Sequence, residues 1–544
     1  MSSALCLAFP RASTSLWLAL LPPILVTLLA SPVYADPYRR QPALDVIHYE
    51  IAIQLADESD AISGTTRVHL RIRQDGISAM WLDLEGMTVS GLKVGGAQRT
   101  FTQHDGRLDF ELDRRYLPGE MVVIEVNYHG TPGAGLLIGK NRHGRRVYFS
   151  ENWPDKAHFW FPSIDHPSDK ATVAFSVTAP EKYDVVANGR LVETRMLQGS
   201  KLTRWSETVP IPTYCMVIGV AEFSVAHAGN LSTIPLTVYA FSEDAAATSI
   251  LFDQSRSILR YFIDLIGPFP YEKLAQVEST TRIGGRENAS AIFYQEKNFP
   301  RTEASVQTVS HEIAHQWFGD SITQDDWDHL WLSEGFATYF ANLFQEHLQG
   351  PGALKGAMAQ AAEAIKQYHE TRPVALIDPE LTELMKKLNA FNYQKGAWIL
   401  HMLRGVLGDR TFFQGIRRYY GLYAERNAST EDFRKAMEAE AGIPLAGFFR
   451  QWCYQAGWPV YQVTWRWNAG TREVEMTFRQ AQTTGLFDMP VQIVLRTGDS
   501  RQERKVRISQ QNQKLRIELP ARPSGLEIDP DGWVLKSVKL TEQP

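Results

Sequence analysis

Hydrophobic and polar residues alternate along the chain from about residue 43 to residue 223. Representative runs are VHLRI at 68–72 and VVIEV at 122–126, and turns that contain Gly or Asp-Gly separate such runs. A repeat of two residues is typical of half-buried strands, because successive side chains of a strand point to opposite faces. This part of the chain is therefore predicted to be an all-β domain.

Near Asp244 the hydrophobic repeat lengthens to the spacing of a helix. Gly267-Pro268 ends the first helical run, and helical patterns continue through Trp452. After Gly457-Trp458-Pro459 the strand-like alternation returns, so a small C-terminal β-sandwich is predicted. The first helical repeat is carried by Ile250, Leu251, Ile258, Leu259, Phe262 and Leu265, and the returning alternation by 474–478, 491–495 and 515–519.

The composition is that of a soluble globular protein. Of the 544 residues, 44% are hydrophobic and 22% charged, and the length allows about three domains of about 100–200 residues. The formal net charge of -5 argues against a nucleic-acid partner, because phosphate binding requires clustered Lys and Arg. Beyond the N-terminal region only Cys215 and Cys453 remain, so stability is expected from core burial and metal instead of a disulfide framework.

The N-terminal segment has the features of a secretory signal peptide. Arg11 precedes an apolar stretch at 16–30, and Val33-Tyr34-Ala35 supplies small residues at the positions that a signal peptidase recognises. The alternative is a single membrane anchor, but the stretch is shorter than the roughly 20 residues of a span, and Pro22-Pro23 interrupts it. We expect residues 1–35 to be removed, leaving a periplasmic or secreted protein without a stable membrane span.

A candidate metal-binding motif lies in the segment 302–318, which has helical periodicity and is followed by Gly319 as a stop signal. Its central residues read HEIAH. Four residues advance a helix by about 400°, so His311 and His315 project from one face and can reach one metal ion. Glu312 would lie beside the open coordination position. A single histidine on a helix is more often a packed or exposed side chain than a metal ligand. The metal-site hypothesis therefore needs a third ligand besides this pair.

Glu334 is the candidate third ligand. It lies in WLSEGFATY at 331–339, where Ser333 is predicted to cap a second helix and Glu334 to occupy its first turn. Two His and one Glu leave one tetrahedral position open for water, which is the arrangement of a catalytic zinc site and not of a closed structural one. The sequence therefore predicts one zinc ion held by His311, His315 and Glu334, with Glu312 as the general base.

These motifs resemble those of the M1 family of zinc aminopeptidases. In that family HExxH is followed by a Glu after eighteen intervening residues. Eighteen residues also separate His315 from Glu334 in this chain. Both HEIAHQWFGD at 311–320 and WLSEGFA at 331–337 are similar to the family's sequences. The resemblance extends over nearly the whole mature chain.

The resemblance also implies residues that bind the substrate. GGREN at 284–288 is similar to the family's GxMEN motif, with Arg286 where Met is usual. Glu287 would then bind the α-ammonium group of the substrate, and the backbone of Gly284 and Gly285 would run beside the peptide. The alternative is that Glu287 is a solvated surface carboxylate.

Two further segments complete the implied site. NYQKG at 392–396 matches the family's tyrosine segment, so Tyr393 would donate a hydrogen bond to the oxyanion, unless it is simply a core tyrosine. The family's Gln-x-Glu element falls on residues 151–153, where Trp153 replaces the second glutamate. Glu151, at the place of the glutamine, would supply the missing charge, and the ring face of Trp153 would attract the ammonium by a cation–π contact.

The resemblance implies a multidomain α+β fold. Its parts would be a β saddle domain at 36–228, a thermolysin-like, mainly helical catalytic domain at 229–455 and a C-terminal β-sandwich at 456–544. The implied activity is removal of N-terminal residues from peptides that have a free N-terminus. Because Trp153 alters the amine site, a zinc hydrolase of internal peptide bonds, other amides or epoxides is an alternative. A third hypothesis is a non-catalytic peptide-binding protein that holds metal only for its fold.

Overall fold

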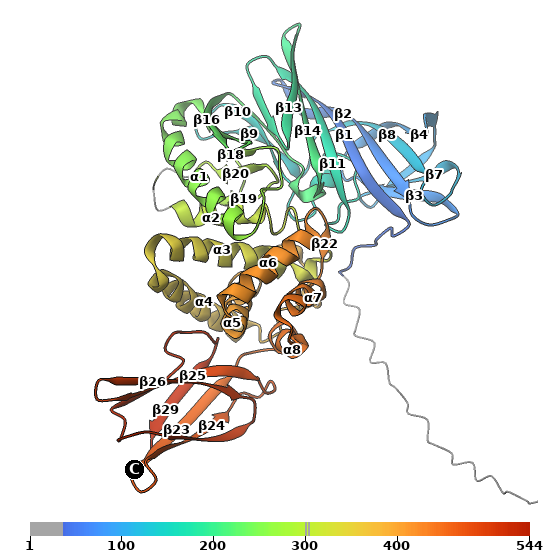
Figure 1. Cartoon of the computed structure of the whole chain (residues 1–544). Helices are drawn as coiled ribbons and strands as arrows, with labels where there is room; N and C mark the ends of the chain where they lie inside the picture. Colours follow the sequence, from blue (N-terminus) through green and yellow to red (C-terminus); the bar gives the residue numbers. More distant parts are fainter. Residues whose placement is uncertain (1–35, 300–301, 303–304) are drawn as a thin grey trace, which may run out of the picture. The chain divides into compact units, whose positions relative to one another are not determined.

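The computed structural model describes residues 36–299, 302 and 305–544 (Figure 1). The predicted signal peptide at 1–35 lies outside the described residues. Along the chain, strands are followed by a region rich in helices and then by strands again, which confirms the predicted multidomain α+β fold. Among the described helices, none combines the length and the apolar character needed to cross a membrane.

The N-terminal β domain is built almost entirely from strands, in agreement with the alternating sequence. Its strands are β1 (Leu44–Ala56), β2 (Ser59–Ile72), β3 (Ile77–Asp83), β4 (Thr88–Val94), β5 (Ala97–Gln98), β6 (Phe101–His104), β7 (Arg107–Tyr116), β8 (Met121–Gly130), β9 (Gly135–Lys140), β10 (Arg146–Glu151), β11 (Lys170–Pro180), β12 (Asp184–Ala187), β13 (Arg190–Leu197), β14 (Ser200–Pro212) and β15 (Ile218–Ala221). They form an eight-stranded sheet (β13-β14-β11-β1-β2-β8-β4-β5), a four-stranded sheet (β12-β15-β10-β9) and a three-stranded sheet (β3-β7-β6). Val68 of β2 pairs with Ile124 of β8, so the two representative runs of the sequence lie side by side.

The central domain starts with a five-stranded sheet. Its strands are β16 (Phe223–Leu231), β17 (Ile234–Phe241), β18 (Leu274–Ser279), β19 (Gly285–Arg286) and β20 (Ala291–Gln295), in the order β16-β17-β18-β20-β19. The strands β17, β18 and β20 run parallel, and β19 pairs antiparallel to β20 at the edge. Every residue of β18 is buried, which explains why its sequence does not alternate. β16 spans the expected boundary between residues 228 and 229, and the domain limits stay predictions.

The helices of the central domain follow, of which α1 and α2 pack against this sheet and α2 and α3 carry the candidate site. They are α1 (Thr248–Leu265), α2 (Val306–His315), α3 (Trp331–Gln349), α4 (Pro351–Thr371), α5 (Gly396–Leu407), α6 (Asp409–Tyr423), α7 (Thr430–Ala441) and α8 (Ala446–Cys453), with two short strands, β21 (Thr323–Gln324) and β22 (Asn427–Ala428), between them. The first helix predicted from the sequence corresponds to α1. Its residues Ile258 and Phe262 share one apolar core with Val238 of β17, Leu274 of β18 and Ile313 of α2.

The helix that carries the HEIAH motif is shorter than the predicted segment 302–318. α2 ends at His315, because the backbone that follows turns back on the helix. The amide of Asp320 donates to the carbonyl of His315 at 3.1 Å, and the amide of Gly319 donates to the carbonyl of Ile322 at 2.8 Å. Gly319 has a φ of +121°, which suits glycine, but it lies in the turn after the helix and does not end the helix as predicted.

Two glycines let α3 come close to the start of α5. A Cβ atom added at Gly335 would lie 2.7 Å from Cα of Gly396, and one added at Gly396 would lie 2.8 Å from Cα of Gly335. Backbone atoms cannot yield at such distances, so a larger residue at either position would push the two segments apart. Glu334 directly precedes Gly335, and the π-helix Phe391–Lys395, which contains Tyr393, directly precedes Gly396. The contact therefore fixes two predicted site residues relative to each other.

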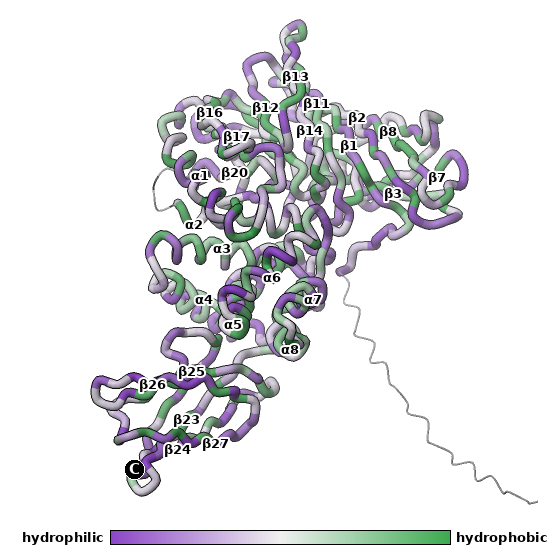
Figure 2. Tube along the Cα trace, in the orientation of Figure 1, coloured by the Kyte–Doolittle hydropathy of each residue, from purple (hydrophilic) through white to green (hydrophobic). Residues whose placement is uncertain are grey.

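The C-terminal domain is the predicted β-sandwich. Its strands are β23 (Val460–Asn468), β24 (Glu473–Gln480), β25 (Met489–Thr497), β26 (Ser500–Ile508), β27 (Asn512–Glu518), β28 (Gly525–Ile528) and β29 (Ser537–Glu542). A four-stranded sheet (β27-β24-β23-β29) and a three-stranded sheet (β26-β25-β28) enclose a core that includes Val463, Phe478 and Ile493. Figure 2 shows hydrophobic and hydrophilic residues interspersed along these strands. By contrast, α5 is largely hydrophobic, in agreement with the burial of most of its residues.

Cys215 and Cys453 are both free and buried, so no disulfide joins them. The Sγ atom of Cys215 lies 3.3 Å from Oδ1 of Asp320 in the central domain. Burial raises the pKa of both thiols. The structure therefore contains these cysteines as packed core residues.

Candidate active site

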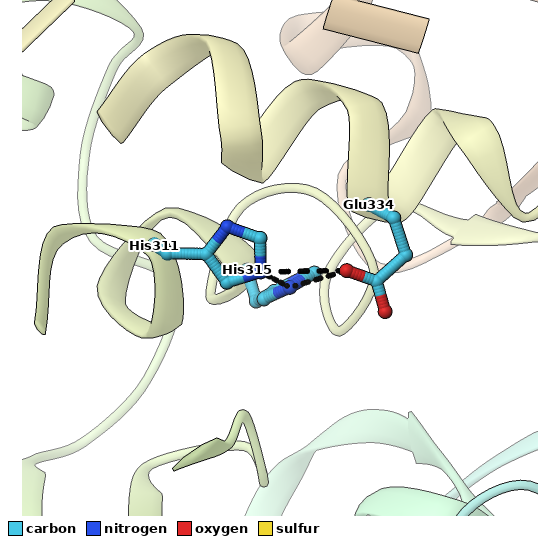
Figure 3. A group of neighbouring side chains, drawn as sticks. All are labelled: His311, His315 and Glu334. Carbon is cyan, nitrogen blue, oxygen red and sulfur yellow. Dashed lines mark hydrogen bonds and ion pairs between the residues drawn. The ribbon is translucent and has the colours of Figure 1, made fainter. Parts of the chain in front are cut away.

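Three side chains from α2 and α3 converge on one point (Figure 3). The Nε2 atoms of His311 and His315 lie 3.1 Å apart, and each is 3.4 Å from Oε2 of Glu334. His315 and Glu334 are buried and His311 is half-buried, and one donor atom from each residue lies within 4.8 Å of the others. The structure thus brings together the three residues that the sequence predicts as metal ligands.

His315 is oriented by contacts on the far side of its ring. Its Nδ1 atom lies 3.0 Å from the carbonyl oxygen of Phe318 and 3.0 Å from Oγ of Ser333. Because a carbonyl can only accept, Nδ1 carries a proton, and Nε2 is the ring nitrogen that would bind a metal ion once the ring is neutral. The predicted capping role of Ser333 is wrong. α3 already begins at Trp331, because Leu330 before it has helical backbone angles, and Ser333 lies within the first turn with its hydroxyl directed at His315.

The opposite charges of His315 and Glu334 shift the pKa values of both groups. Burial lowers the pKa of His315, but the facing carboxylate of Glu334 outweighs burial and raises this pKa to about 10. Burial likewise acts to raise the pKa of Glu334, and the two imidazoles outweigh it and hold this pKa far below its usual range. Oε2 of Glu334 is buried without a hydrogen-bond partner among the described residues. Such an oxygen, facing two ring nitrogens, is a suitable ligand for zinc, which accepts imidazole and carboxylate donors.

Glu312 lies between the candidate metal ligands and the GGREN segment. Its side chain is buried, and burial raises the pKa of its carboxyl to about 7. A Cβ atom at Gly285 would lie 2.0 Å from Oε1 of Glu312, so only glycine leaves room for the carboxylate. This close approach places β19 directly beside the predicted general base.

Tyr393 lies beside the candidate metal ligands. Its ring stacks on that of His311, with centroids 5.9 Å apart and an angle of 8° between the planes. Burial raises the pKa of its phenol well above the usual range, and the neighbouring carboxylates of Glu334 and Glu287 raise it further. These charged neighbours belong to the candidate site, so Tyr393 is not a core tyrosine remote from it.

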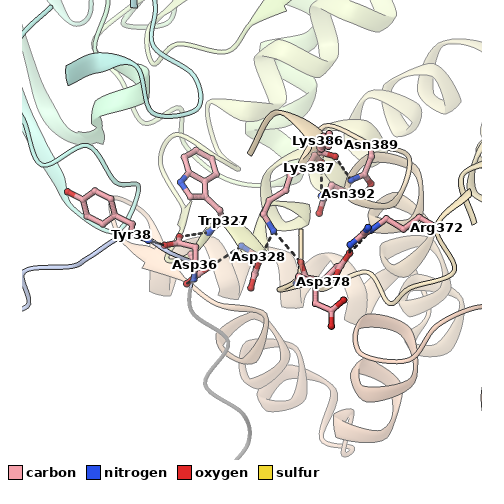
Figure 4. Close-up of polar contacts among 12 residues, drawn as sticks. Asp36, Tyr38, Trp327, Asp328, Arg372, Asp378, Lys386, Lys387, Asn389 and Asn392 are labelled. Atoms are coloured by element: carbon pink, nitrogen blue, oxygen red, sulfur yellow. Dashed lines mark hydrogen bonds and ion pairs between the residues drawn. The ribbon is translucent and has the colours of Figure 1, made fainter. Parts of the chain in front are cut away.

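A buried ion pair connects the segments that carry Glu334 and Tyr393 (Figure 4). Nζ of Lys387 donates to Oδ1 of Asp328 at 2.6 Å, and both side chains are almost completely buried. Asp328 lies just before α3, and Lys387 lies just before the π-helix. Nδ2 of Asn392 also donates to the carbonyl of Lys387 at 2.7 Å. These contacts hold the π-helix against the start of α3.

Glu287 is anchored by two residues that the sequence reasoning missed. Its carbonyl oxygen accepts a hydrogen bond from Nε2 of Gln316 at 2.7 Å, and the same amide group donates to Oδ2 of Asp320 at 2.8 Å. Glu287 is only 6% exposed, so it is not a solvated surface carboxylate. Gln316 and Asp320 both lie in HEIAHQWFGD, and their presence in this motif was the signal that could have identified them.

The β domain contributes the other two predicted substrate-binding residues. Glu151, at the end of β10, accepts a hydrogen bond from the backbone amide of Arg282 at 2.8 Å. Trp153 is buried, and its ring faces the guanidinium of Arg286, with Cζ 5.6 Å from the ring centroid. The structure therefore brings Glu151 and Trp153 to the GGREN segment. The cation that faces the ring of Trp153 is therefore Arg286 of this chain, whereas the sequence predicted the ammonium group of the substrate at this place.

Comparisons with known proteins agree with this arrangement. The sequence model described as the peptidase M1 N-terminal domain matches residues 46–215, and that of the peptidase family M1 domain matches residues 251–452. Glutamyl aminopeptidase of Homo sapiens is 26% identical over 471 residues, which are 78% of this chain and 48% of that protein. Probable aminopeptidase 2 of Sulfurisphaera tokodaii is 25% identical over 434 residues, which are 76% of this chain and 54% of that protein. The chain spans about half the length of these curated relatives.

Solved structures extend the likeness to the fold. An M1 zinc metallopeptidase from Deinococcus radiodurans is 28% identical with a TM-score of 0.68, and the match covers 78% of this chain and 97% of that one. A mutant M1 zinc metallopeptidase from the same organism, bound to a Tyr-Ser-Ala substrate, is 27% identical with a TM-score of 0.68, with coverages of 77% and 96%. Because both the β domain and the helical domain match, the chain belongs to the M1 peptidase family.

Proposed function

We propose that the protein is a zinc-dependent aminopeptidase that removes N-terminal residues from peptides. The observation that carries the proposal is the convergence of His311, His315 and Glu334 beside the buried carboxylate of Glu312. Membership of the family supports it, because matching relatives are named as aminopeptidases and zinc metallopeptidases. A protein that held metal only for its fold would need neither Glu312 nor Tyr393 at this point.

His311, His315 and Glu334 would hold one zinc ion, which supplies Lewis acidity and makes a water molecule acidic near neutral pH. Glu312 takes a proton from the attacking water and returns it to the amine that leaves. The close contact between Glu312 and Gly285 supports this role, because it keeps the carboxylate beside the strand along which the peptide would run.

Two residues would act directly on the substrate. Tyr393 donates its phenol hydrogen to the oxyanion as the scissile carbonyl is attacked, and its place beside His311 supports this role. Glu287 binds the free α-ammonium group, and the hydrogen bond from Gln316 holds its backbone in place. Because the amine is held at a fixed distance from Glu312, one residue is removed at a time.

We also propose that the signal peptide is removed after Ala35 and that the mature protein is periplasmic or secreted. The contacts of Asp36 support this processing site (Figure 4). Its carboxylate lies 2.7 Å from Nε2 of His166, and its backbone nitrogen lies 3.3 Å from Oδ2 of Asp326. Cleavage after Ala35 would turn this nitrogen into an ammonium, which would gain an ion pair with Asp326.

The proposed activity is tested with the zinc-loaded protein and its Glu312→Gln variant. Aminoacyl p-nitroanilides should be hydrolysed by the wild type, and a chelator should stop the reaction. Glu312→Gln should lower kcat by about 10²–10⁴-fold, because glutamine cannot transfer the proton, while zinc content stays at one ion per chain. Absence of hydrolysis by the zinc-loaded wild type would favour the non-catalytic hypothesis, and a variant within tenfold of wild type would remove Glu312 from the mechanism.

Tyr393→Phe isolates the proposed oxyanion contact, because phenylalanine keeps the ring that stacks on His311 and removes only the hydroxyl. We expect kcat to fall by about 10²–10³-fold with a smaller change in KM. Steady-state kinetics on one anilide substrate would measure both constants. An effect confined to KM would mean that Tyr393 binds the ground state of the substrate instead.

Substrates with free and acetylated N-termini test the role of Glu287. Loss of the charge-assisted hydrogen bond should lower kcat/KM for the acetylated substrate by at least about tenfold. Glu287→Ala should reduce hydrolysis of free-amine substrates far more than that of acetylated ones. If the wild type cleaves both kinds equally well, end recognition is absent and internal cleavage becomes the better hypothesis.

Export of the full-length chain from a bacterial host tests the processing site. The intact mass of the recovered protein should correspond to a chain that begins at Asp36. An Ala35→Arg variant is the matched control, because a large charged residue at the cleavage position should block processing. Recovery of the wild type in the membrane fraction with residues 1–35 attached would support the membrane-anchor alternative.

A further inference from the structure

Arg286 is a buried cation with incomplete pairing. The residue is 6% exposed, and its Nε atom is buried without a hydrogen-bond partner in the part of the chain that the structure describes. The ion pair that it makes is long, with 3.9 Å between Nε and Oε1 of Glu151. A guanidinium has five N–H donors, and burying its charge without hydrogen bonds is unfavourable. Arg286 is therefore suited to bind an additional anion.

The position of Arg286 relates this cation to the substrate. Arg286 follows Gly285 in β19 and precedes Glu287. Successive residues of a strand face opposite sides. A Cβ atom at Gly285 would point toward Glu312. The side chain of Arg286 is therefore directed away from the proposed catalytic base and toward Glu151 and Trp153. In the sequence it directly precedes Glu287, the residue proposed to bind the amine.

Among the described residues, the neighbours of Arg286 do not satisfy all the hydrogen-bond donors of its guanidinium. Oε1 of Glu151 already accepts a hydrogen bond from the amide of Arg282 at 2.8 Å, and it lies 3.9 Å from Nε of Arg286, beyond hydrogen-bond distance. Trp153 approaches the guanidinium with its ring face and offers no acceptor oxygen. A planar guanidinium can bind carboxylates at two edges, and burial strengthens such pairing because water is excluded.

We propose that Arg286 binds the side-chain carboxylate of an N-terminal Asp or Glu, so that the enzyme prefers acidic N-terminal residues to the corresponding amides. The inference rests on the proposed aminopeptidase activity. Glu287 binds the ammonium and Arg286 the carboxylate of the same substrate residue. The two opposite charges of an N-terminal glutamate are thus matched by two adjacent residues of opposite charge.

The experiment compares glutamyl and glutaminyl p-nitroanilides, which have nearly the same shape and differ in charge. For the wild type, kcat/KM should be about tenfold to a hundredfold higher for the glutamyl substrate. In Arg286→Met, which introduces the residue usual in the related motif, this ratio should fall to one or below. Because both substrates are measured on the same variant, the ratio cancels any general loss of activity.

Arg282→Met is the matched control, because Arg282 lies in the same segment but its side chain is exposed. It removes an equal charge and should leave the glutamyl-to-glutaminyl ratio unchanged. If the wild type cleaves leucyl p-nitroanilide but does not prefer the glutamyl substrate, or if Arg286→Met keeps the preference, the inference fails while the proposed function stands.

If the zinc-loaded wild type cleaves no anilide at all, the proposed function fails and a binding measurement decides the inference. L-Glutamate should then raise the melting temperature of the wild type more than L-glutamine does, and this difference should vanish in Arg286→Met. Equal shifts of the melting temperature by the two amino acids would contradict the proposed subsite for an acidic side chain.

Discussion

A carboxylate buried against two imidazole nitrogens is the interaction on which the rest of this structure depends. Glu334 comes from α3 and the two histidines from α2, so the site exists only while these helices stay in contact. The glycine pair at 335 and 396 and the buried ion pair between Lys387 and Asp328 both act at the start of α3. The packing around α3 thus keeps the carboxylate in the place where it faces both imidazole rings.

The short strand β19 connects the chemistry of the site to the recognition of the substrate. On one side, Gly285 leaves space for the carboxylate of Glu312. On the other side, Arg286 approaches Glu151 and Trp153 of the β domain. Alternation along a single strand therefore separates the proposed catalytic base from the proposed subsite for the N-terminal side chain.

The network behind Glu287 shows how a second layer of residues supports this strand. Gln316 bonds both the carbonyl of Glu287 and the carboxylate of Asp320, and all three residues are buried. Because Gln316 directly follows α2, the residue that would bind the substrate amine is attached to the helix that carries His311 and His315. The candidate metal ligands and the proposed amine-binding residue are thereby held at a fixed distance from each other, which cleavage at a fixed distance from the N-terminus would require.

The sequence by itself determined the fold class, the helix that pairs His311 with His315, and Glu334 as the candidate third ligand, because these depend on local periodicity and on a motif spacing. The tertiary structure alone decided how distant segments meet. It replaced the capping role of Ser333 by a contact with His315, added the support of Glu287 by Gln316, and brought Arg286 to Trp153. No periodicity encodes these contacts, since each depends on the packing of elements that are separated in the sequence.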